Sequence, residues 1–223
     1  MNKVNKQNNG KITKFIDQPV TPFHINQNFG DNKACIPVSG KGKLITCDGH
    51  NPPKGYRSVY SFMNGHNGLD LRAGHGQPVY CPQDGIVEEL VTDETRGYGI
   101  SIITSRKFYC IETKKQEYFK MRFWHNMFHF KKLGDKVFMG DLIALADNTG
   151  YSSGNHLHFE IKPITHKVTK DSKIKNVVNI LQGNGYLGAV DPLPYMTDKP
   201  AKRWLNIKSY ADRLKFIISL IIK

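Results

Sequence analysis

The segment SSGNHLHFEI, residues 152–161, ends in an alternation of polar and apolar side chains that is typical of a β-strand. Successive side chains of a strand point to opposite faces, so His156, His158 and Glu160 are expected to share one face. The leucine, phenylalanine and isoleucine between and after them form an apolar opposite face. The segment therefore predicts a strand that packs on a core and carries two imidazoles side by side on its polar face.

Short runs of the same kind recur along the chain, separated by Gly, Pro, Asn and Asp. They are QPVYCP (77–82), GIVEELVT (85–92), GISIITS (99–105), YFKMRFWH (118–125) and DLIALA (141–146). Closely spaced short strands without helical periodicity between them are typical of antiparallel all-β domains. The sequence therefore predicts an all-β, antiparallel domain over residues 20–197.

Three segments do not fit this strand pattern. Residues 1–19 are polar, and we interpret them as a flexible or partner-bound arm. Residues 33–58 are rich in Gly, Pro and Lys and are interpreted as a long surface loop, and the lysine-rich residues 163–188 as an insertion. Cys35 and Cys47 flank a glycine-rich part of the loop, where they would either pair in an oxidising setting or stay free.

The last segment, residues 198–223, differs in kind from the rest of the chain. Its apolar residues recur at spacings of three and four, which lines one face of a helix. They are Trp204, Ile207, Ala211, Leu214, Ile218 and Ile221. Seven lysines and arginines against two aspartates make the segment basic. It predicts a C-terminal amphipathic helix that packs on its own domain or a sister subunit, lies on a membrane surface, or docks on a larger assembly.

The whole chain is strongly basic, with a net charge of +13 and a pI near 9.5. This charge favours a polyanionic partner: nucleic acid, an anionic membrane or a cell-wall polymer. No recognised nucleic-acid-binding motif is present, so we expect no specific nucleic-acid partner. The N-terminal residues lack the apolar core of a secretory signal peptide, and no run of about 18–20 apolar residues occurs. We therefore expect neither a signal peptide nor a transmembrane segment.

Two further motifs carry histidines on predicted strands. The motif GHNGLD places His66, Gly68 and Asp70 on one face of an extended segment, and the glycine leaves room between two candidate ligands. The motif FWHNM places His125 at the end of an aromatic strand. Catalytic zinc typically takes three nitrogen or oxygen ligands from the protein and leaves a fourth position to water. His66, Asp70 and one histidine of the HLH pair would satisfy that set, and the remaining histidines would act on the water and the developing oxyanion.

These motifs resemble the lysostaphin/LytM-type family of zinc metallopeptidases, which cut peptidoglycan peptides. The resemblance extends over GHNGLDLRAGHGQPVYCPQDGIV, GYGISIIT, KLGDKVFMGDLIALADNTGYSSGNHLHFEI and AVDPLPYM, and so covers most of residues 60–161 and resumes at 189–196. It implies an antiparallel β-sheet domain with an open groove across a zinc ion.

The resemblance also implies roles for individual residues. The family's zinc ligands fall on His66, Asp70 and His158, and its two non-ligand active-site histidines fall on His125 and His156. Zinc-bound water would attack a peptide carbonyl, while the second pair orients or deprotonates that water and stabilises the tetrahedral intermediate. The resemblance does not divide these tasks between the two histidines.

Two other residues are candidates for supporting roles. Glu160 follows the ligands on the same strand face, where it would either orient an imidazole or be solvated. Tyr60, six residues before His66, is a candidate donor to the oxyanion.

The leading functional hypothesis is a zinc-dependent endopeptidase that cuts stem-peptide cross-links or bridges in bacterial peptidoglycan. The alternative is a structural or binding component of a phage tail or cell-wall machine that keeps the fold with little or no activity. Because we expect no signal peptide, we expect the protein to reach the wall in a bacteriophage particle, where the C-terminal helix docks on protein partners. A cytoplasmic protein with non-classical release is the second hypothesis for its location.

Overall fold

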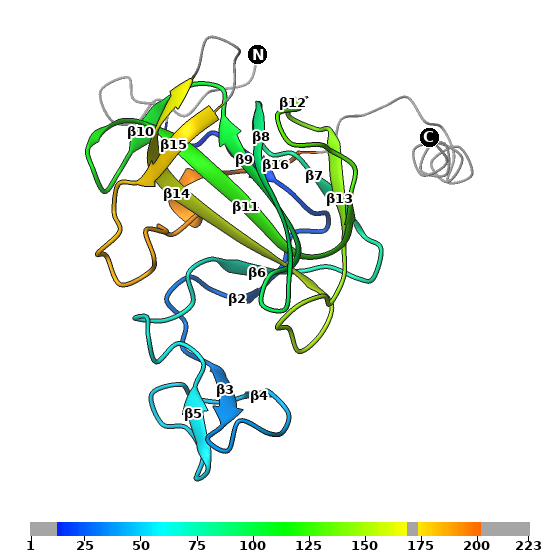
Figure 1. The fold of residues 1–223 in the computed structure, drawn as a ribbon, viewed down its shortest axis with the longest axis vertical. Coiled ribbons are helices and arrows are strands. Elements are labelled where there is room, and N and C mark those ends of the chain that lie inside the picture. Colours follow the sequence, from blue (N-terminus) through cyan, green and yellow to red (C-terminus); the bar gives the residue numbers. More distant parts are fainter. Residues whose placement is uncertain (1–12, 169–173, 202–223) are drawn as a thin grey trace.

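The computed structural model describes residues 13–168 and 174–201 (Figure 1). Within these ranges the chain forms sixteen strands and one short 3₁₀ helix, so the predicted all-β class is confirmed. Eleven of the strands form one sheet, which makes up the body of the domain. They are β2 (Ile25–Gln27), β6 (Leu69–Arg72), β7 (Pro78–Tyr80), β8 (Gly85–Asp93), β9 (Gly97–Thr104), β10 (Phe108–Cys110), β11 (Lys115–His129), β12 (Lys136–Val137), β13 (Leu142–Ala146), β14 (His156–Val168) and β15 (Ile174–Asn179).

The order β12-β8-β9-β11-β14-β6-β2 runs across this sheet, and its pairings are antiparallel. The sequence runs that were expected to be strands fall on β7, β8, β9, β11, β13 and β14. The two longest strands, β11 and β14, are neighbours at the centre of the sheet. Their alternation of side chains therefore decides which residues face the core and which face the opposite side.

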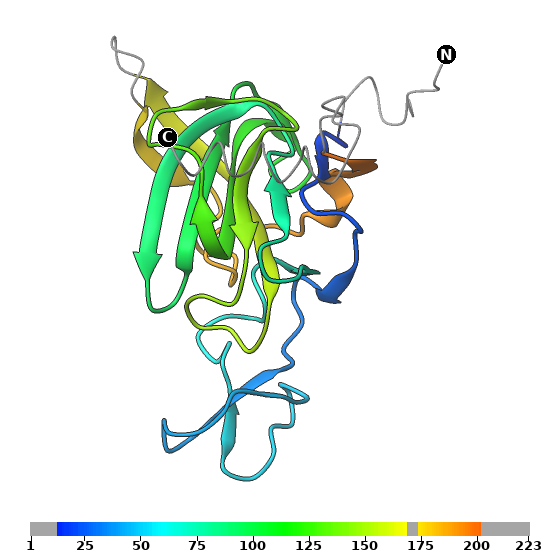
Figure 2. The same cartoon turned by 90° about the vertical axis from the view of Figure 1, so that its right-hand side faces the viewer.

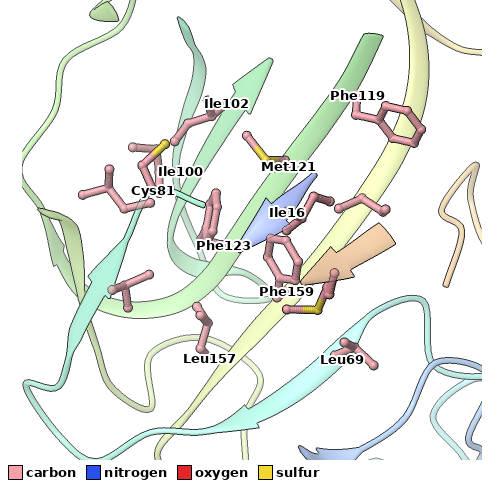
Figure 3. Close-up of a cluster of buried hydrophobic side chains, with 14 of the residues drawn as sticks. Ile16, Leu69, Cys81, Ile100, Ile102, Phe119, Met121, Phe123, Leu157 and Phe159 are labelled. Carbon is pink, nitrogen blue, oxygen red and sulfur yellow. The ribbon is translucent and has the colours of Figure 1, made fainter. Parts of the chain in front are cut away.

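The hydrophobic core lies against one face of β11 and β14 (Figure 3). Phe119, Met121 and Phe123 on β11 are fully buried there, as are Leu157 and Phe159 on β14. Full burial of apolar side chains of this size contributes roughly 1.5–3 kcal/mol each. The apolar face predicted for β14 is thus the face that anchors this strand, and it fixes the polar face on the other side.

The first strand corrects the prediction that residues 1–19 form an arm. β1 (Ile16–Gln18) pairs with β16 (Met196–Pro200), and Phe15 stacks on Phe108 with ring centroids 3.8 Å apart. Apolar side chains in an otherwise polar segment are buried here, which ties the segment to the domain. The pair is parallel, so the domain is not purely antiparallel. The first twelve residues of the predicted arm lie outside the described part.

Residues 33–58 were predicted as a long surface loop, and the structure corrects this prediction, because the segment contains a second small sheet. Its strands are β3 (Ala34–Pro37), β4 (Ile45–Thr46) and β5 (Tyr56–Ser58), with β3 in the middle. A disulfide between Cys35 and Cys47 closes it. Figures 1 and 2 show this three-stranded unit (residues 34–58) projecting from the end of the domain where β2 and β6 lie. Strands this short leave no periodic run that the sequence alone would reveal.

Residues 163–188 were predicted as an insertion, but their first half continues the main sheet. β14 runs on to Val168 and pairs with β15, with Ile164 opposite Asn179. Lys167 on β14 stands opposite Lys175 on β15, so the sheet continues into this basic stretch.

The C-terminal part of the described chain turns back along the domain. The 3₁₀ helix η1 (Leu193–Tyr195) leads into β16, so residues 198–200 are strand and not the start of the predicted helix. The rest of the predicted amphipathic helix, residues 202–223, lies outside the described part. None of the helical structure in residues 13–168 and 174–201 has the length and apolar character needed to cross a membrane.

Candidate metal centre

The register between β6 and β14 brings two candidate ligands together. Asp70 stands directly opposite His158 in this antiparallel pair, and such pairs have Cβ atoms about 4.5–5.5 Å apart. His66 lies four residues before Asp70, in the segment that leads into β6. Its backbone N–H donates to the carbonyl of Asp31 at 2.7 Å, and its own carbonyl accepts from the N–H of Gly30 at 2.8 Å. These bonds hold the His66 segment beside the sheet.

Three donor atoms of these residues point at one another. His66 Nε2 lies 2.9 Å from His158 Nδ1 and 3.1 Å from Asp70 Oδ1. His158 Nδ1 lies 3.1 Å from the same carboxylate oxygen. Both imidazoles are buried and the carboxylate is partly buried. The structure therefore brings together the three residues that the resemblance implies as ligands, in a cluster that could hold a metal ion.

This donor set fits a zinc ion. Two imidazole nitrogens and one carboxylate oxygen are ligands that catalytic zinc uses, with the fourth position left to water or substrate. A tetrahedral ion with bonds of about 2.0–2.1 Å needs donor atoms roughly 3.3 Å apart. The observed separations of 2.9 to 3.1 Å are close to that value. Small movements of the side chains would therefore complete the site.

Contacts around the cluster prepare its atoms to bind a cation. His66 Nδ1 lies 3.1 Å from the carbonyl oxygen of Asn28, so it donates there and leaves Nε2 for the cluster. Burial alone would raise the pKa of Asp70, but the surrounding histidines hold it well below its usual range. Burial alone would lower the pKa of His158, yet the carboxylates of Asp70 and Glu160 raise it to about 9. The site thus favours positive charge.

Gly68 lies between His66 and Asp70, and its lack of a side chain leaves space for the imidazole of His158. A Cβ atom placed on Gly68 would lie 2.6 Å from the carbonyl oxygen of Phe159 and 2.9 Å from the imidazole of His158. Non-bonded carbon and oxygen atoms do not approach so closely. Any side chain at Gly68 would therefore displace His158 or the strand that carries it.

We expect Gly68→Ala to weaken zinc binding by about 10–100-fold, which is the usual cost of disturbing the support of a metal ligand. Competition with a chromophoric chelator measures this affinity. Gly74→Ala is the matched control, because its added Cβ would meet only Gln77 Oε1, at 3.9 Å. The control should bind zinc like the unmodified chain. Equal affinities for all three proteins would contradict the role assigned to Gly68.

His125 and His156 stand beside the candidate ligands, each anchored through Nδ1. Nδ1 of His125 lies 2.8 Å from the carbonyl oxygen of Thr149, and Nδ1 of His156 lies 2.8 Å from that of Gly154. A carbonyl oxygen only accepts, so each Nδ1 carries a proton and each Nε2 is left for other partners. The two rings have centroids 4.8 Å apart, and Nε2 of His156 lies 3.4 Å from Asp70 Oδ1.

A β-bulge aims His125 into the site. The register of β11 against β9 shifts between Phe123 and Asn126, and His125 has a φ of 63°, a value that non-glycine residues rarely adopt. The fully buried Asn126 holds the bulge, since its Nδ2 donates at 2.9 Å to the carbonyls of Phe123 and Tyr98. Burial, together with the charges of the neighbouring histidines, lowers the pKa of His125 to about 3. His125 is therefore neutral at pH 7.

Glu160 is fully buried, so of the two readings that the sequence left open, the solvated one is wrong. Its carboxylate accepts hydrogen bonds from Asn67 Nδ2 and Arg122 Nη1, both at 2.6 Å, and lies 3.2 Å from Lys162 Nζ. Glu160 Oε2 is 3.8 Å from Nε2 of His158, a buried nitrogen without a hydrogen-bond partner among the described residues. Glu160 thus places a negative charge near Nε2 of His158, the ring nitrogen that is not part of the cluster.

Arg122 is a further residue of the site, and no motif in the sequence indicates its role. Arg122 lies opposite Glu160, and Trp124 lies opposite His158, in the pairing of β11 with β14. The Arg122 guanidinium is 4.4 Å from the centroid of the Trp124 ring, which stacks on the His158 imidazole with centroids 4.9 Å apart. Alternation along β11 places both residues on its polar face, but only the strand register shows what they meet.

A groove of about 600 Å³ gives access to all five candidate site residues, and the three-stranded unit supplies part of its wall. Tyr60 also lines the groove, with its ring centroid 5.6 Å from that of His66 and its hydroxyl 3.4 Å from Gln27 Nε2. Burial and the charge of Asp70 raise the pKa of the Tyr60 hydroxyl far above its usual value. The hydroxyl therefore keeps its proton and is able to donate it in a hydrogen bond.

Sequence comparison matches residues 64–175 to the model of peptidase family M23, a segment that contains all five candidate site residues. An uncharacterized metalloprotease from Haemophilus influenzae is 34% identical over 110 residues, which cover 46% of this chain and 21% of the relative. The peptidoglycan DD-endopeptidase ShyA from Vibrio cholerae is 28% identical over 125 residues, which cover 56% of this chain and 26% of the relative. The chain thus spans about a fifth to a quarter of the length of these relatives.

Comparison of structures gives the same fold. A zinc-containing peptidase from Vibrio cholerae superposes with a TM-score of 0.50 and 23% sequence identity, covering 84% of this chain and 41% of that one. The family match extends over half of the chain, residues 64–175 of 223, and includes both the GHNGLD and the NHLHFE motifs. The chain belongs to peptidase family M23.

Proposed function

We propose that this chain hydrolyses peptide bonds in bacterial peptidoglycan, with a zinc ion held by His66, Asp70 and His158. The observation that carries the proposal is the convergence of three metal-binding atoms and two further histidines, His125 and His156, in one groove. Membership of peptidase family M23 supports a peptidase. Relatives named as peptidoglycan DD-endopeptidases support the substrate class. All five positions carry the residues that catalysis needs, which favours an enzyme over a binding module.

The mechanism that fits this geometry divides the work between metal and histidines. A zinc ion held by His66, Asp70 and His158 would supply an activated water at neutral pH and would polarise the scissile carbonyl. Because Nδ1 of His125 and of His156 donates to a backbone carbonyl, Nε2 of each is the atom that handles protons. One of these nitrogens accepts the proton of the attacking water, and the proton is then delivered to the leaving amine.

Other residues of the groove stabilise charge and hold the ligands in place. The protonated hydroxyl of Tyr60 is positioned to donate a hydrogen bond to the oxyanion that develops on the carbonyl. The carboxylate of Glu160 lies 3.8 Å from Nε2 of His158, and the ring of Trp124 stacks on the His158 imidazole. These two contacts keep the imidazole of His158 in one orientation.

We infer that the protein acts at the bacterial cell wall, where its charge of +13 would favour contact with anionic wall polymers. Delivery in a bacteriophage particle, with residues 198–223 as the docking segment, stays a hypothesis from the sequence. The alternative function, a structural or binding component without activity, differs in one observable way. It predicts a protein that binds walls and releases no peptide fragments.

Digestion of purified peptidoglycan by the zinc-loaded chain tests the proposal. We expect new amino termini to appear in the wall peptides. They should not appear with His66→Ala or in the presence of a chelator, because both remove the metal.

A further inference from the structure

The three-stranded unit (residues 34–58) forms part of the groove wall, and a disulfide and backbone hydrogen bonds hold its conformation. The Cys35–Cys47 disulfide closes it, and the backbone N–H of Cys47 donates to the carbonyl of Lys33. At its base, Val59 N–H donates to the carbonyl of Ala34 at 3.0 Å, and Asn32 Nδ2 donates to the carbonyl of Gly49 at 3.2 Å. Side chains on this unit are therefore held in defined positions relative to the groove.

Arg57, on β5 of this unit, presents an uncompensated positive charge to the groove. Its side chain lines the groove and is exposed, and its Nη1 lies 3.4 Å from the hydroxyl of Ser61. No carboxylate of the described residues lies within ion-pair distance of the guanidinium. Lys33, the other lysine or arginine of the described groove wall, is already paired with Asp31 at 3.2 Å. The guanidinium of Arg57 is thus available to an incoming ligand.

Tyr60 and Tyr151 line the groove together with Arg57 and Asp70. Burial raises the pKa of the Tyr151 hydroxyl, and the nearby positive charge of Arg57 opposes that rise. The negative charge of Asp70 and, more weakly, Tyr151 both raise the pKa of the Tyr60 hydroxyl. All four residues line the same groove. Arg57 and the candidate metal centre line one groove, so a peptide that fills this groove contacts both.

The surroundings of Arg57 are apolar, which strengthens a charge-assisted contact. Ile36 stands opposite Arg57 in the pairing of β3 with β5, and Leu44, Ile45 and Phe62 line the same groove. Phe62 is 70% exposed although it is a large apolar side chain. A hydrogen bond between charged groups is stronger where water is partly excluded.

We propose that Arg57 binds a free carboxylate of the peptide substrate, so that the three-stranded unit selects stem peptides that carry a side carboxylate over those in which it is amidated. The planar guanidinium offers two parallel N–H donors that match the two oxygens of a carboxylate. The stem peptides of peptidoglycan carry such carboxylates. This inference rests on the proposed function, since it names the feature of that substrate which the groove recognises.

Two synthetic stem peptides test it, identical except that one side carboxylate is free in the first and a carboxamide in the second. Fluorescence anisotropy with labelled peptides and the metal-stripped chain measures binding without cleavage. We expect the acid form to bind about tenfold more tightly, which is the usual scale of one charge-assisted hydrogen bond. Arg57→Ala should remove the preference, and Arg57→Lys should keep part of it. With the zinc-loaded chain the same preference should appear in KM and leave kcat unchanged.

Lys54→Ala is the matched control, because Lys54 is an exposed cation of the same unit that does not line the groove. It should keep the full preference for the acid form. Equal binding of the two peptides by the unmodified chain, no measurable binding of either, or equal loss of preference in Lys54→Ala would overturn the inference. A preference in binding without cleavage of either peptide would leave it standing and refute the proposed hydrolysis instead.

Discussion

Replacement of His125 or His156 by alanine is expected to lower kcat by about 10²–10⁴-fold, the usual contribution of a general acid or base. The metal content should stay unchanged, because neither residue belongs to the cluster of His66, Asp70 and His158. KM should change little, since both imidazoles act through Nε2 on the reacting atoms and not on the rest of the peptide. Metal analysis of the purified variants, run beside steady-state kinetics on a defined wall peptide, measures both quantities.

His24→Ala is the matched control for these two variants. Its side chain is exposed and does not line the groove, so its kcat should lie within about twofold of the unmodified value. A loss of zinc together with activity in His125→Ala or His156→Ala would show that the residue is a ligand. Full activity in both variants would remove proton transfer by these histidines from the mechanism.

Arg122→Met is expected to lower the free energy of unfolding by roughly 3 kcal/mol, because the buried carboxylate of Glu160 then loses one of the two cations, Arg122 and Lys162, that contact it. The carboxylate left behind is that of Glu160, which is fully buried and accepts from Arg122 Nη1 at 2.6 Å. Zinc affinity should fall as well, since Arg122 also contacts the ring of Trp124 that stacks on His158. Urea denaturation and chelator competition measure the two effects.

The double variant Arg122→Met/Glu160→Gln, compared with the two single variants, tests whether the cost comes from the contact between Arg122 and Glu160. Its loss of stability should be smaller than the sum of the two single losses, because Lys162 loses its partner Glu160 in both variants that carry Glu160→Gln and this cost cancels in the comparison. Arg106→Met, at an exposed arginine away from the groove, should change stability by no more than about 0.5 kcal/mol. If the losses of the two single variants simply added in the double variant, the ion pair would not explain the cost.

Local patterns in the sequence were sufficient to predict the strands that carry the site. The alternation in β14 and β11 identifies the face that the core buries, because period-two alternation is a property of each strand by itself. The resemblance then implied His66, Asp70 and His158 as a set, and the structure brings their donor atoms together. The alternation in β14, taken by itself, predicts only that His158 and Glu160 lie on the same face of the strand.

Features that depend on contacts between distant segments could not be predicted in the same way. The pairing of Arg122 with Glu160 depends on the register of two strands about forty residues apart in sequence. The bulge at His125 depends on Asn126 reaching the carbonyl of Tyr98 on another strand. The three-stranded unit, predicted as a loop, depends on a disulfide and on strands of two to four residues. None of these leaves a periodic signal.

The most direct test of the central proposal is mass spectrometry of the fragments released from purified peptidoglycan by the zinc-loaded chain. Walls with two different cross-link chemistries should be used, since the cleaved bond then becomes visible in the fragment masses. We predict new amino termini in at least one wall, about one zinc per chain, and loss of both in His66→Ala. A chain that holds stoichiometric zinc but cuts no peptide bond in either wall would contradict the account and leave a binding module in its place.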